Sequence, residues 1–285
     1  MNALPLDFYD DVIHRISIAD IGRLKRISGY WSSTAGTHFN RRREVRVSLK
    51  SNKKGTKVGV KLDSWQSDGP FEIDVKYDRI KSVDLSEYPS DETEEVTLEH
   101  LRTKTLPMIR SIASDCKLVF VDAFQPHKQC DIILDGLKEC HGLSSIWAYS
   151  CRNKGQELIR RQIEFGNLKA LCLMENIWPI DFQGLIKVFV KSPKFRILHT
   201  NLTLDFDIVT CVFDRFFTGE LTVFELRGSP SFPFDDLRSL YPEFAFKPRY
   251  WTSECKTVFW SVPSTKKKVQ ATVFNGKLEA VGLLA

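Results

Sequence analysis

The sequence has no uninterrupted run of about 20 apolar residues, which is the length that a membrane-spanning helix needs. Its N-terminal apolar stretch is broken by Asp7, Asp10 and Asp11, and these charges argue against a secretory signal peptide. We therefore expect a protein without a membrane partner, located in the cytoplasm and/or the nucleus.

Paired cysteines are also missing, because the seven cysteines are an odd number and no C-x-x-C pair occurs among them. This pattern favours buried thiols in a reducing compartment over a disulfide framework. The one cluster that resembles a metal site is Cys140-His141 with Cys130 and Cys151, and its spacing is irregular for zinc. We therefore predict no metal and no other cofactor.

Catalytic signatures are absent as well. The sequence contains no G-x-S-x-G, Walker, zincin or Gly-rich phosphate-binding pattern, and its six histidines stand singly. Asp205 and Asp207 flank Phe206 at an expected helix start, where N-terminal capping accounts for them. We predict that the protein is not an enzyme and has no catalytic residue.

Charge of one sign is in only mild excess, with a formal net charge of +5. The basic runs Arg41-Arg42-Arg43, Lys53-Lys54 and Lys266-Lys267-Lys268 are expected to be solvated loops, which disfavours a nucleic-acid partner. Nucleic-acid binding through the basic residues near 41–57 stays open as a hypothesis, and a steep loss of affinity with salt would support it.

What the sequence does contain is enough apolar material for a sizeable core. It has 285 residues, of which 42% are hydrophobic, 12% aromatic and 27% charged, so that wholesale disorder is not expected. One large domain and a small additional module fit this length.

The first 43 residues predict three short amphipathic helices. Pro5 stands where a first helical turn can begin, and the apolar residues of this helix recur at fourfold spacing in Phe8, Val12 and Ile16. Ser17 and Asp20 offer cap side chains for a second helix with Ile21, Leu24 and Ile27 on one face. Gly29 ends that helix, and a third follows from Tyr30-Trp31.

One pattern in this segment is specific, and its members are Leu4-Pro5, Val12, Ile13, Ile16, Asp20-Ile21, Leu24, Ile27-Ser28 and Trp31. In order and spacing, without a gap, it resembles the F-box, the helical module that docks substrate receptors onto Skp-type adaptors of cullin ubiquitin ligases. A small helical bundle or a helix-turn-helix does not demand this order. The pattern departs from the family at Gly29-Tyr30, where a basic pair is common, and in using isoleucine at several leucine positions.

The resemblance implies that the N-terminal helices bind the adaptor, and through it a cullin. The implied adaptor-binding residues, some of which must also form the module's own core, are Leu4, Pro5, Val12, Ile13, Ile16, Leu24, Ile27 and Trp31.

From residue 116 onward a second pattern recurs at intervals of 27, 25, 27 and 26 residues. Its copies are Cys116-x-x-Val119-x-Val121, Leu143-x-x-Ile146-x-Ala148, Leu168-x-x-Leu171-x-Leu173, Phe195-x-x-Leu198-x-Thr200 and Leu221-x-x-Phe224-x-Leu226. The period falls within the roughly 20–29 residues of leucine-rich repeats, and segments with helical periodicity lie between the copies. We predict an irregular solenoid of strand–helix units, with Ile80-x-x-Val83-x-Leu85 as an earlier copy.

In such a strand the residues between and after the inward positions face outward on the open side of the sheet. Aromatic and arginine side chains dominate the energetics of protein interfaces. We therefore predict an unidentified protein target bound by outward residues, namely Phe120, Trp147, Tyr149, His199 and Arg227.

Alternating patterns flank the repeats. Residues 45–49, 58–62 and 71–77 alternate with period two, which predicts half-buried antiparallel strands, and a helix with Pro107 is expected over 92–112. Near the C-terminus, Asn275-Gly276 is a strong signal for a β-hairpin. This hairpin is predicted to cap the open end of the solenoid.

The predicted fold class is α/β, with an N-terminal three-helix F-box followed by a leucine-rich-repeat-like solenoid with β-strand caps. Its segments are 1–43 (F-box), 44–115 (antiparallel β segment and helix), 116–247 (repeats) and 248–285 (hairpin cap). This order of parts resembles the large nematode-type F-box families, specifically over 4–31 and more loosely beyond. The implied function is that of a substrate receptor, and the alternative is a non-ligase interaction scaffold whose N-terminal helices cap its own solenoid.

Overall fold

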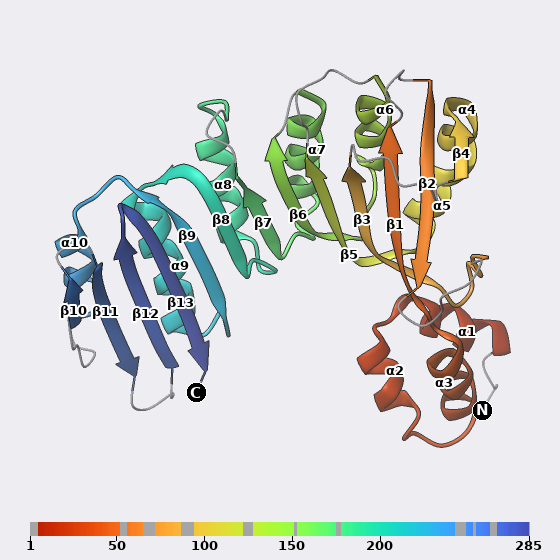
Figure 1. Ribbon diagram of the computed structural model, residues 1–285. Coiled ribbons are helices and arrows are strands. Elements are labelled where there is room, and N and C mark those ends of the chain that lie inside the picture. The colour runs from red at the N-terminus through yellow and green to blue at the C-terminus, as the bar shows by residue number, and fades with distance from the viewer. Residues whose placement is uncertain are drawn as a thin grey trace. The chain divides into compact units, whose positions relative to one another are not determined.

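The computed structural model describes residues 5–51, 56–64, 72–86, 94–121, 128–150, 153–174, 178–242, 249–252, 255–262 and 267–284. The protein is a mixed α/β structure with helices at its N-terminus and a large, open, mixed sheet (Figure 1). Two compact units divide the chain. The first comprises residues 1–118 with 126–143, and the second comprises residues 119–125 with 144–285.

The first unit begins with the three helices that the sequence predicts, α1 (Leu6–Arg15), α2 (Ile18–Leu24) and α3 (Tyr30–Arg41). Ser17 caps α2, because its Oγ accepts a hydrogen bond from the backbone N–H of Asp20 at 3.1 Å. Gly29 precedes α3 at a φ of 81°, a conformation that favours glycine. Ile13, Ile21 and Ala35 form the core between these helices.

The helices lead into β1 (Glu44–Ser51), β2 (Lys57–Ser64), β3 (Arg79–Ser86) and β4 (Glu94–Thr97), which are hydrogen-bonded in the order β3-β1-β2-β4. β1 and β2 are antiparallel, as predicted, whereas β1 and β3 are parallel. The prediction of a third strand over 71–77 is wrong, because residues 75–77 form a turn. The buried Asp78 carboxylate closes this turn by accepting from the Asp74 N–H at 2.7 Å. Phe71 lies outside the described residues.

The predicted helix over 92–112 begins later than expected, because Glu94–Thr97 pair with β2 as β4. It runs through α4 (Leu98–His100), a π-helix (Leu101–Thr105) and α5 (Leu106–Ile112). Pro107 has no N–H to donate to a carbonyl of the preceding turn, and the wider π-turn lies directly before it. β5 (Ala113–Val121) and α6 (Lys128–Leu137) follow.

In the second unit, parallel strands alternate with helices. The elements are β6 (Leu143–Ser150), α7 (Asn153–Glu164), β7 (Ala170–Leu173), α8 (Phe182–Lys191), β8 (Ile197–Leu204), α9 (Phe206–Thr218) and β9 (Phe224–Pro230). Each strand pairs in parallel with the next, and the helices pack side by side. Asp205 caps α9 by accepting from the Ile208 N–H at 2.9 Å, as its position predicts.

The inward positions of the repeated pattern are buried in its last four copies, at Leu143, Ile146, Ala148, Leu168, Leu171, Leu173, Phe195, Leu198, Thr200, Leu221, Phe224 and Leu226. The earlier copy at Ile80, Val83 and Leu85 is buried as well. The copy at Cys116 differs. Along β5 the buried residues are Cys116, Leu118 and Phe120, since a continuous extended strand alternates with period two.

The C-terminal strands continue the sheet of the second unit. After α10 (Phe234–Ser239) come β10 (Arg249–Thr252), β11 (Cys255–Val262), β12 (Lys267–Phe274) and β13 (Lys277–Leu284), hydrogen-bonded in the order β9-β13-β12-β11-β10. Asn275 and Gly276 form the predicted hairpin turn with φ values of 48° and 71°. The segment predicted as a cap therefore pairs with the edge of β9, antiparallel to it.

Two basic runs that were expected in solvated loops contribute buried side chains. Arg42 and Lys267 are 5% and 7% exposed. Lys267 Nζ donates to the carbonyls of Phe216 at 2.6 Å and Phe217 at 3.1 Å, and it thus satisfies the end of α9. Lys53 and Lys54 lie outside the described residues.

We expect the pairing of β13 with β9 to depend on Gly282, which lies opposite Phe224. A Cβ atom at position 282 would overlap the buried Phe224 ring. Gly282→Ala should lower the free energy of unfolding by about 1–3 kcal/mol, as overpacking of a core does.

Gly184→Ala on α8 is the matched control, because no atom lies within 4 Å of the added methyl group. It should be neutral or stabilising by less than about 1 kcal/mol. Urea unfolding followed by circular dichroism measures both variants, and equal midpoints for the two would contradict this packing.

Candidate protein-interaction surfaces

The N-terminal helices bury only part of the predicted adaptor-binding set. Ile13 is fully buried between the helices and is thus one of the predicted residues that form the module's own core. Ile16, Leu24 and Trp31 are partly buried and pack against that core. Val12 is half-buried, Pro5 is exposed, and Leu4 lies outside the described residues.

Ile27 is the large apolar residue of this set that is clearly exposed, at 49%. Five further large side chains of the helices are exposed, and the sequence prediction did not include them: Leu6, Phe8, Ile18, Tyr30 and Phe39. We refer to Ile27 with the first four of these residues as the exposed set. Helical periodicity indicated Phe8 as apolar, but in so short a helix it does not distinguish the face that packs inward from the face left open.

An aromatic cluster joins the starts of α1 and α3. The ring centroids of Tyr9 and Trp31 are 4.7 Å apart and nearly perpendicular, and Phe8 and Tyr30 each lie 6.0 Å from Tyr9. Tyr9 is 8% exposed, whereas Phe8 and Tyr30 are 42% and 57% exposed. The cluster is therefore anchored inside the module and presents two aromatic side chains at its surface, as protein interfaces commonly do.

Two buried arginines hydrogen-bond the backbone carbonyls at the C-terminal end of α1. The Arg42 guanidinium donates to the carbonyls of Ile16 at 2.7 Å, Ile13 at 2.9 Å and His14 at 3.2 Å. Arg79 donates to the same His14 carbonyl at 2.6 Å. Burial lowers the pKa of both guanidinium groups, that of Arg79 to about 10, so that both still carry charge at neutral pH. These bonds satisfy carbonyls that a helix C-terminus leaves without partners.

Two histidines lie at the same end of the module. His38 is fully buried, and its Nε2–H donates to Asp10 Oδ1 at 2.7 Å. His14 Nδ1–H donates to the Lys76 carbonyl at 3.1 Å. Burial lowers the pKa of both imidazoles, aided at His14 by the charge of Arg79 and opposed at His38 by Asp10. The folded module therefore favours the neutral form of both rings.

The second unit carries the predicted target-binding residues on the open side of its sheet. Strand register places Trp147 beside Cys172, Cys172 beside His199, and His199 beside Arg227. Tyr149 is 38% exposed. Phe120 is the exception, since it is 1% exposed, and its predicted role in target contact is corrected to that of a core residue.

Charged residues on this open side form a chain across three strands. His199 Nε2 lies 2.9 Å from Glu225, and Arg227 lies 2.8 Å from both Glu225 and Glu279. The Trp147 ring stands 6.4 Å from that of His199. The side chains of the repeat strands are thus largely paired with one another, which leaves Tyr149 as the most exposed of the predicted aromatic contacts.

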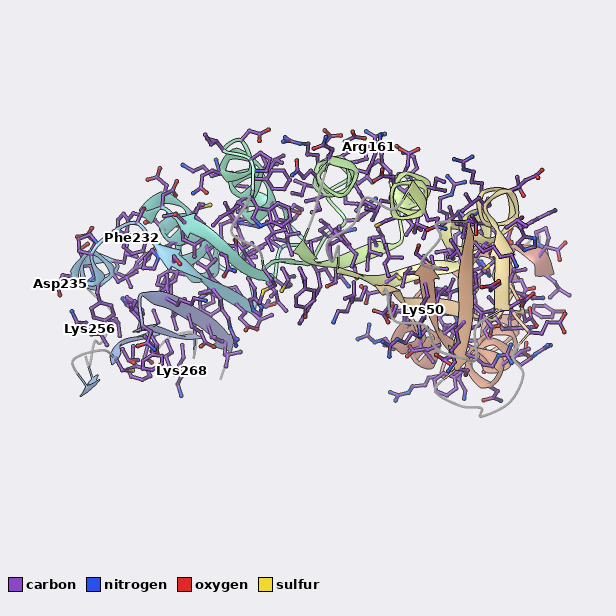
Figure 2. The ribbon with its side chains drawn as sticks, turned by 45° about the horizontal axis from the view of Figure 1, so that its top comes forward. Lys50, Arg161, Phe232, Asp235, Lys256 and Lys268 are labelled. Carbon is purple, nitrogen blue, oxygen red and sulfur yellow. The ribbon has the colours of Figure 1, made fainter. Side chains whose placement is uncertain are left out.

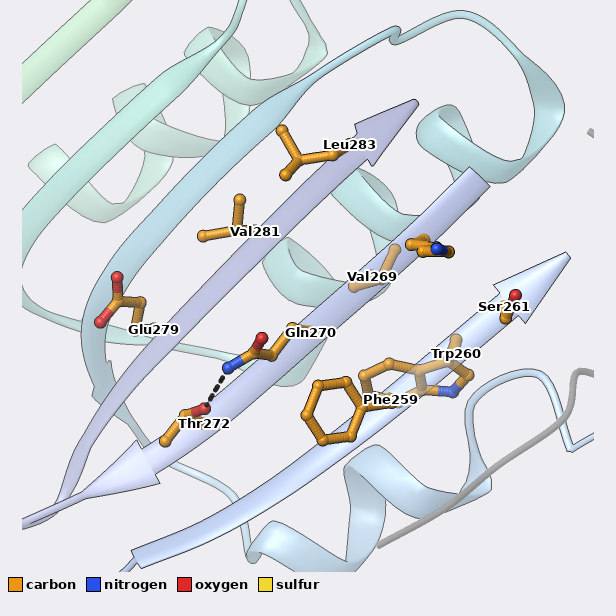
Figure 3. A pocket seen from close by; sticks show the side chains of 10 residues that line it. Phe259, Trp260, Ser261, Val269, Gln270, Thr272, Glu279, Val281 and Leu283 are labelled. Carbon is orange, nitrogen blue, oxygen red and sulfur yellow. Dashed lines mark hydrogen bonds between the residues drawn. The ribbon is translucent and has the colours of Figure 1, made fainter. Parts of the chain in front are cut away.

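Two grooves extend this surface onto the C-terminal strands, where the sequence prediction had placed no site. One of about 520 Å³ is lined by residues of β8, β9, β12 and β13, and one of about 840 Å³ by residues of β11 to β13 (Figure 3). They share Thr272 and Glu279. Gln270 Nε2–H donates a hydrogen bond to Thr272 Oγ1 at 3.3 Å, which the dashed line in Figure 3 marks. The Asn275-Gly276 signal predicted this hairpin, but it did not tell which face of its strands stays open.

Other kinds of site find little support in the part of the chain that the structure describes. No group of three or more His, Cys, Asp or Glu side chains there is placed to hold a metal ion. Cys116 and Cys140 are buried thiols, and burial raises the pKa of each. Cys151 lies outside the described residues. Among the helices described, none combines the length and the apolar character needed to cross a membrane.

Comparison with known proteins adds no relative. The sequence matches no family model, and no curated protein matches it.

The pKa values of His14 and His38 predict that the first unit loses stability as the pH falls. An unfolded histidine takes up a proton near pH 6.5, whereas these folded rings take it up only at lower pH. The contribution of these two neutral rings to the free energy of unfolding is therefore fully present above about pH 6.5, and it is lost as the pH falls through the folded pKa values. NMR titration of the imidazole resonances, assigned with His14→Gln and His38→Gln, measures both pKa values. Values at or above about 6.5 would contradict the prediction.

Proposed function

We propose that this chain is the substrate-receptor subunit of a Skp–cullin–F-box ubiquitin ligase. Its N-terminal helices bind a Skp-type adaptor, and through it a cullin, while the open sheet face of the second unit binds a protein target. In this role it holds other proteins and carries out no chemistry, so it is not an enzyme and needs no cofactor.

The observation that carries the proposal is the exposed set of the helical module. Ile13, Ile21 and Ala35 form the buried core of the module, with Ile16, Leu24 and Trp31 packed against it, and the five side chains of the exposed set remain 39–60% exposed. Burying the exposed part of each contributes about 1 kcal/mol, or on the order of 5 kcal/mol together. Micromolar binding corresponds to about 8 kcal/mol. Polar contacts and the partly buried Trp31 must supply the remainder.

The sequence pattern from Pro5 to Trp31 supports the choice of partner, because it resembles the F-box in order and spacing. The burial of the repeated inward residues, together with the parallel pairing of β6 to β9, supports the further proposal that residues 143–230 form leucine-rich-like repeats. Both points are consistent with a receptor built from a docking module and a binding domain.

One observation favours the alternative, a non-ligase scaffold whose helices cover part of the same chain. Arg42 and Arg79 are buried where α1 ends, and Arg79 is the first residue of β3. The helices are thereby bonded to the sheet of the first unit. A scaffold of this kind would show no affinity for the adaptor, which the following experiment measures.

Ile27→Asp is the sharpest test of adaptor docking. Ile27 is half exposed in the turn after α2, so a charge there spares the core that Ile13→Asp would disrupt. We expect the full chain to bind a purified Skp-type adaptor with micromolar or tighter affinity. The substitution should weaken binding at least about tenfold, because it puts an unpaired charge into an apolar contact. Isothermal titration calorimetry measures both proteins.

Val188→Asp serves as the matched control, since Val188 is 56% exposed on α8 in the second unit. It should leave the affinity for the adaptor unchanged. Equal binding by the Ile27→Asp and Val188→Asp chains would contradict docking through the exposed set. No binding by the unaltered chain would favour the scaffold.

A further inference from the structure

The outward side of the C-terminal hairpin is an open surface, which we call the hairpin face. Along β12 and β13, every second residue is buried on the side that packs on α9, namely Val269, Ala271, Leu278 and Ala280. The residues between them point the other way, and Phe274 and Leu283 are 51% and 53% exposed.

Cross-strand pairing gives the hairpin face a regular order. Its pairs are Lys268 with Leu283, Gln270 with Val281, Thr272 with Glu279, and Phe274 with Lys277. Each end of the face therefore combines a lysine with a large apolar side chain. The centre combines polar groups with Val281, and Phe259 of β11 lies beside Gln270.

The charges of the hairpin face are unbalanced. Glu279 is paired with Arg227 at 2.8 Å. Lys268, marked in Figure 2, and Lys277 are both exposed, and neither forms an ion pair with any residue that the structure describes. The face therefore presents one exposed lysine without an ion pair at each end.

The length of the face defines what can span it. Lys268 and Phe274 are six residues apart on one strand, or about 20 Å, and Lys277 lies opposite Phe274. The grooves of about 840 Å³ and about 520 Å³ include these two ends respectively and share Thr272 and Glu279 between them. Val281 and Leu283 follow each other at every second residue, about 7 Å apart, which is also the side-chain repeat of an extended peptide.

We propose that the hairpin face binds an extended protein segment that carries acidic residues about six positions apart and apolar side chains between them. The two carboxylates pair with Lys268 and Lys277. The apolar side chains contact Leu283, Val281 and Phe274. This inference names the target class of the proposed receptor and rests on that function only for the fate of the bound protein.

The test uses the full chain and a fluorescent synthetic peptide of about ten residues, with two aspartates about six positions apart and leucine or valine alternating with serine between them. Fluorescence anisotropy should give micromolar binding. Lys268→Glu with Lys277→Glu should weaken it at least about tenfold, since two attractive contacts become repulsive. A peptide with lysines in place of the aspartates should bind this double variant better than the unaltered chain.

Lys191→Glu is the matched control, because Lys191 is exposed on α8, outside the hairpin face. It should bind the acidic peptide like the unaltered chain. Equal affinities of the control and the double variant would overturn the inference. So would absence of peptide binding, tighter binding of an oligonucleotide at the same lysines, or self-association of the chain that the double variant abolishes.

Should the double variant fail to fold by circular dichroism, Lys268→Gln and Lys277→Gln keep the test open. Each should weaken binding about threefold, as loss of one exposed ion pair does. Adaptor titration of the same proteins separates the two proposals. Loss of peptide binding with intact adaptor binding concerns the hairpin face alone, and peptide binding without adaptor binding concerns the ligase role alone.

Discussion

The arrangement of the first unit depends on one interaction. The buried side chains of Arg42 and Arg79 donate hydrogen bonds to backbone carbonyls at the C-terminal end of α1. Arg42 stands just before β1 and Arg79 begins β3, and both donate to the carbonyl of His14. Two like charges at one buried site are costly unless hydrogen bonds satisfy them, and here helix carbonyls provide the acceptors. Loss of Arg42 would remove the side-chain donor that the Ile13 and Ile16 carbonyls have here. The arrangement therefore fixes the helices to the start of the parallel pair β1 and β3.

This interaction bears on why the exposed set of apolar residues can remain outside the core of the helices. The bonds of Arg42 and Arg79 hold one end of α1, and the small core of Ile13, Ile21 and Ala35, with Ile16, Leu24 and Trp31 packed against it, holds the helices together. A module without such an anchor would have to bury more of its apolar surface to stay folded. The exposed set is thus compatible with a stable free chain.

Much of the architecture was predictable from the sequence, because it depends on the intervals at which apolar and turn residues recur. The four copies of the repeated pattern from Leu143 onward form parallel strands, as the repeat interval predicts. Asn275 and Gly276 form a hairpin turn, as the Asn-Gly pair predicts. The sites were less predictable. Phe120 faces inward because the buried residues of β5 alternate with period two from Cys116 onward, which the repeated pattern did not assume. Ile13 was predicted from the resemblance to the F-box, and a sequence pattern does not tell which of its apolar residues pack inside the module.

The open sheet face also has two parts that sequence spacing does not distinguish, namely the repeat strands β8 and β9 and the hairpin of β12 and β13. On the repeat strands, Glu225 lies 2.9 Å from His199 Nε2 and 2.8 Å from Arg227, so these polar side chains are paired within the chain. On the hairpin, antiparallel pairing sets each lysine beside an apolar residue, and no opposite charge lies across from it. Directly opposite charges would have stabilised the hairpin by about 0.2–1 kcal/mol. The Asn-Gly turn fixes the register of the hairpin, so these lysines are not required to set its strand pairing.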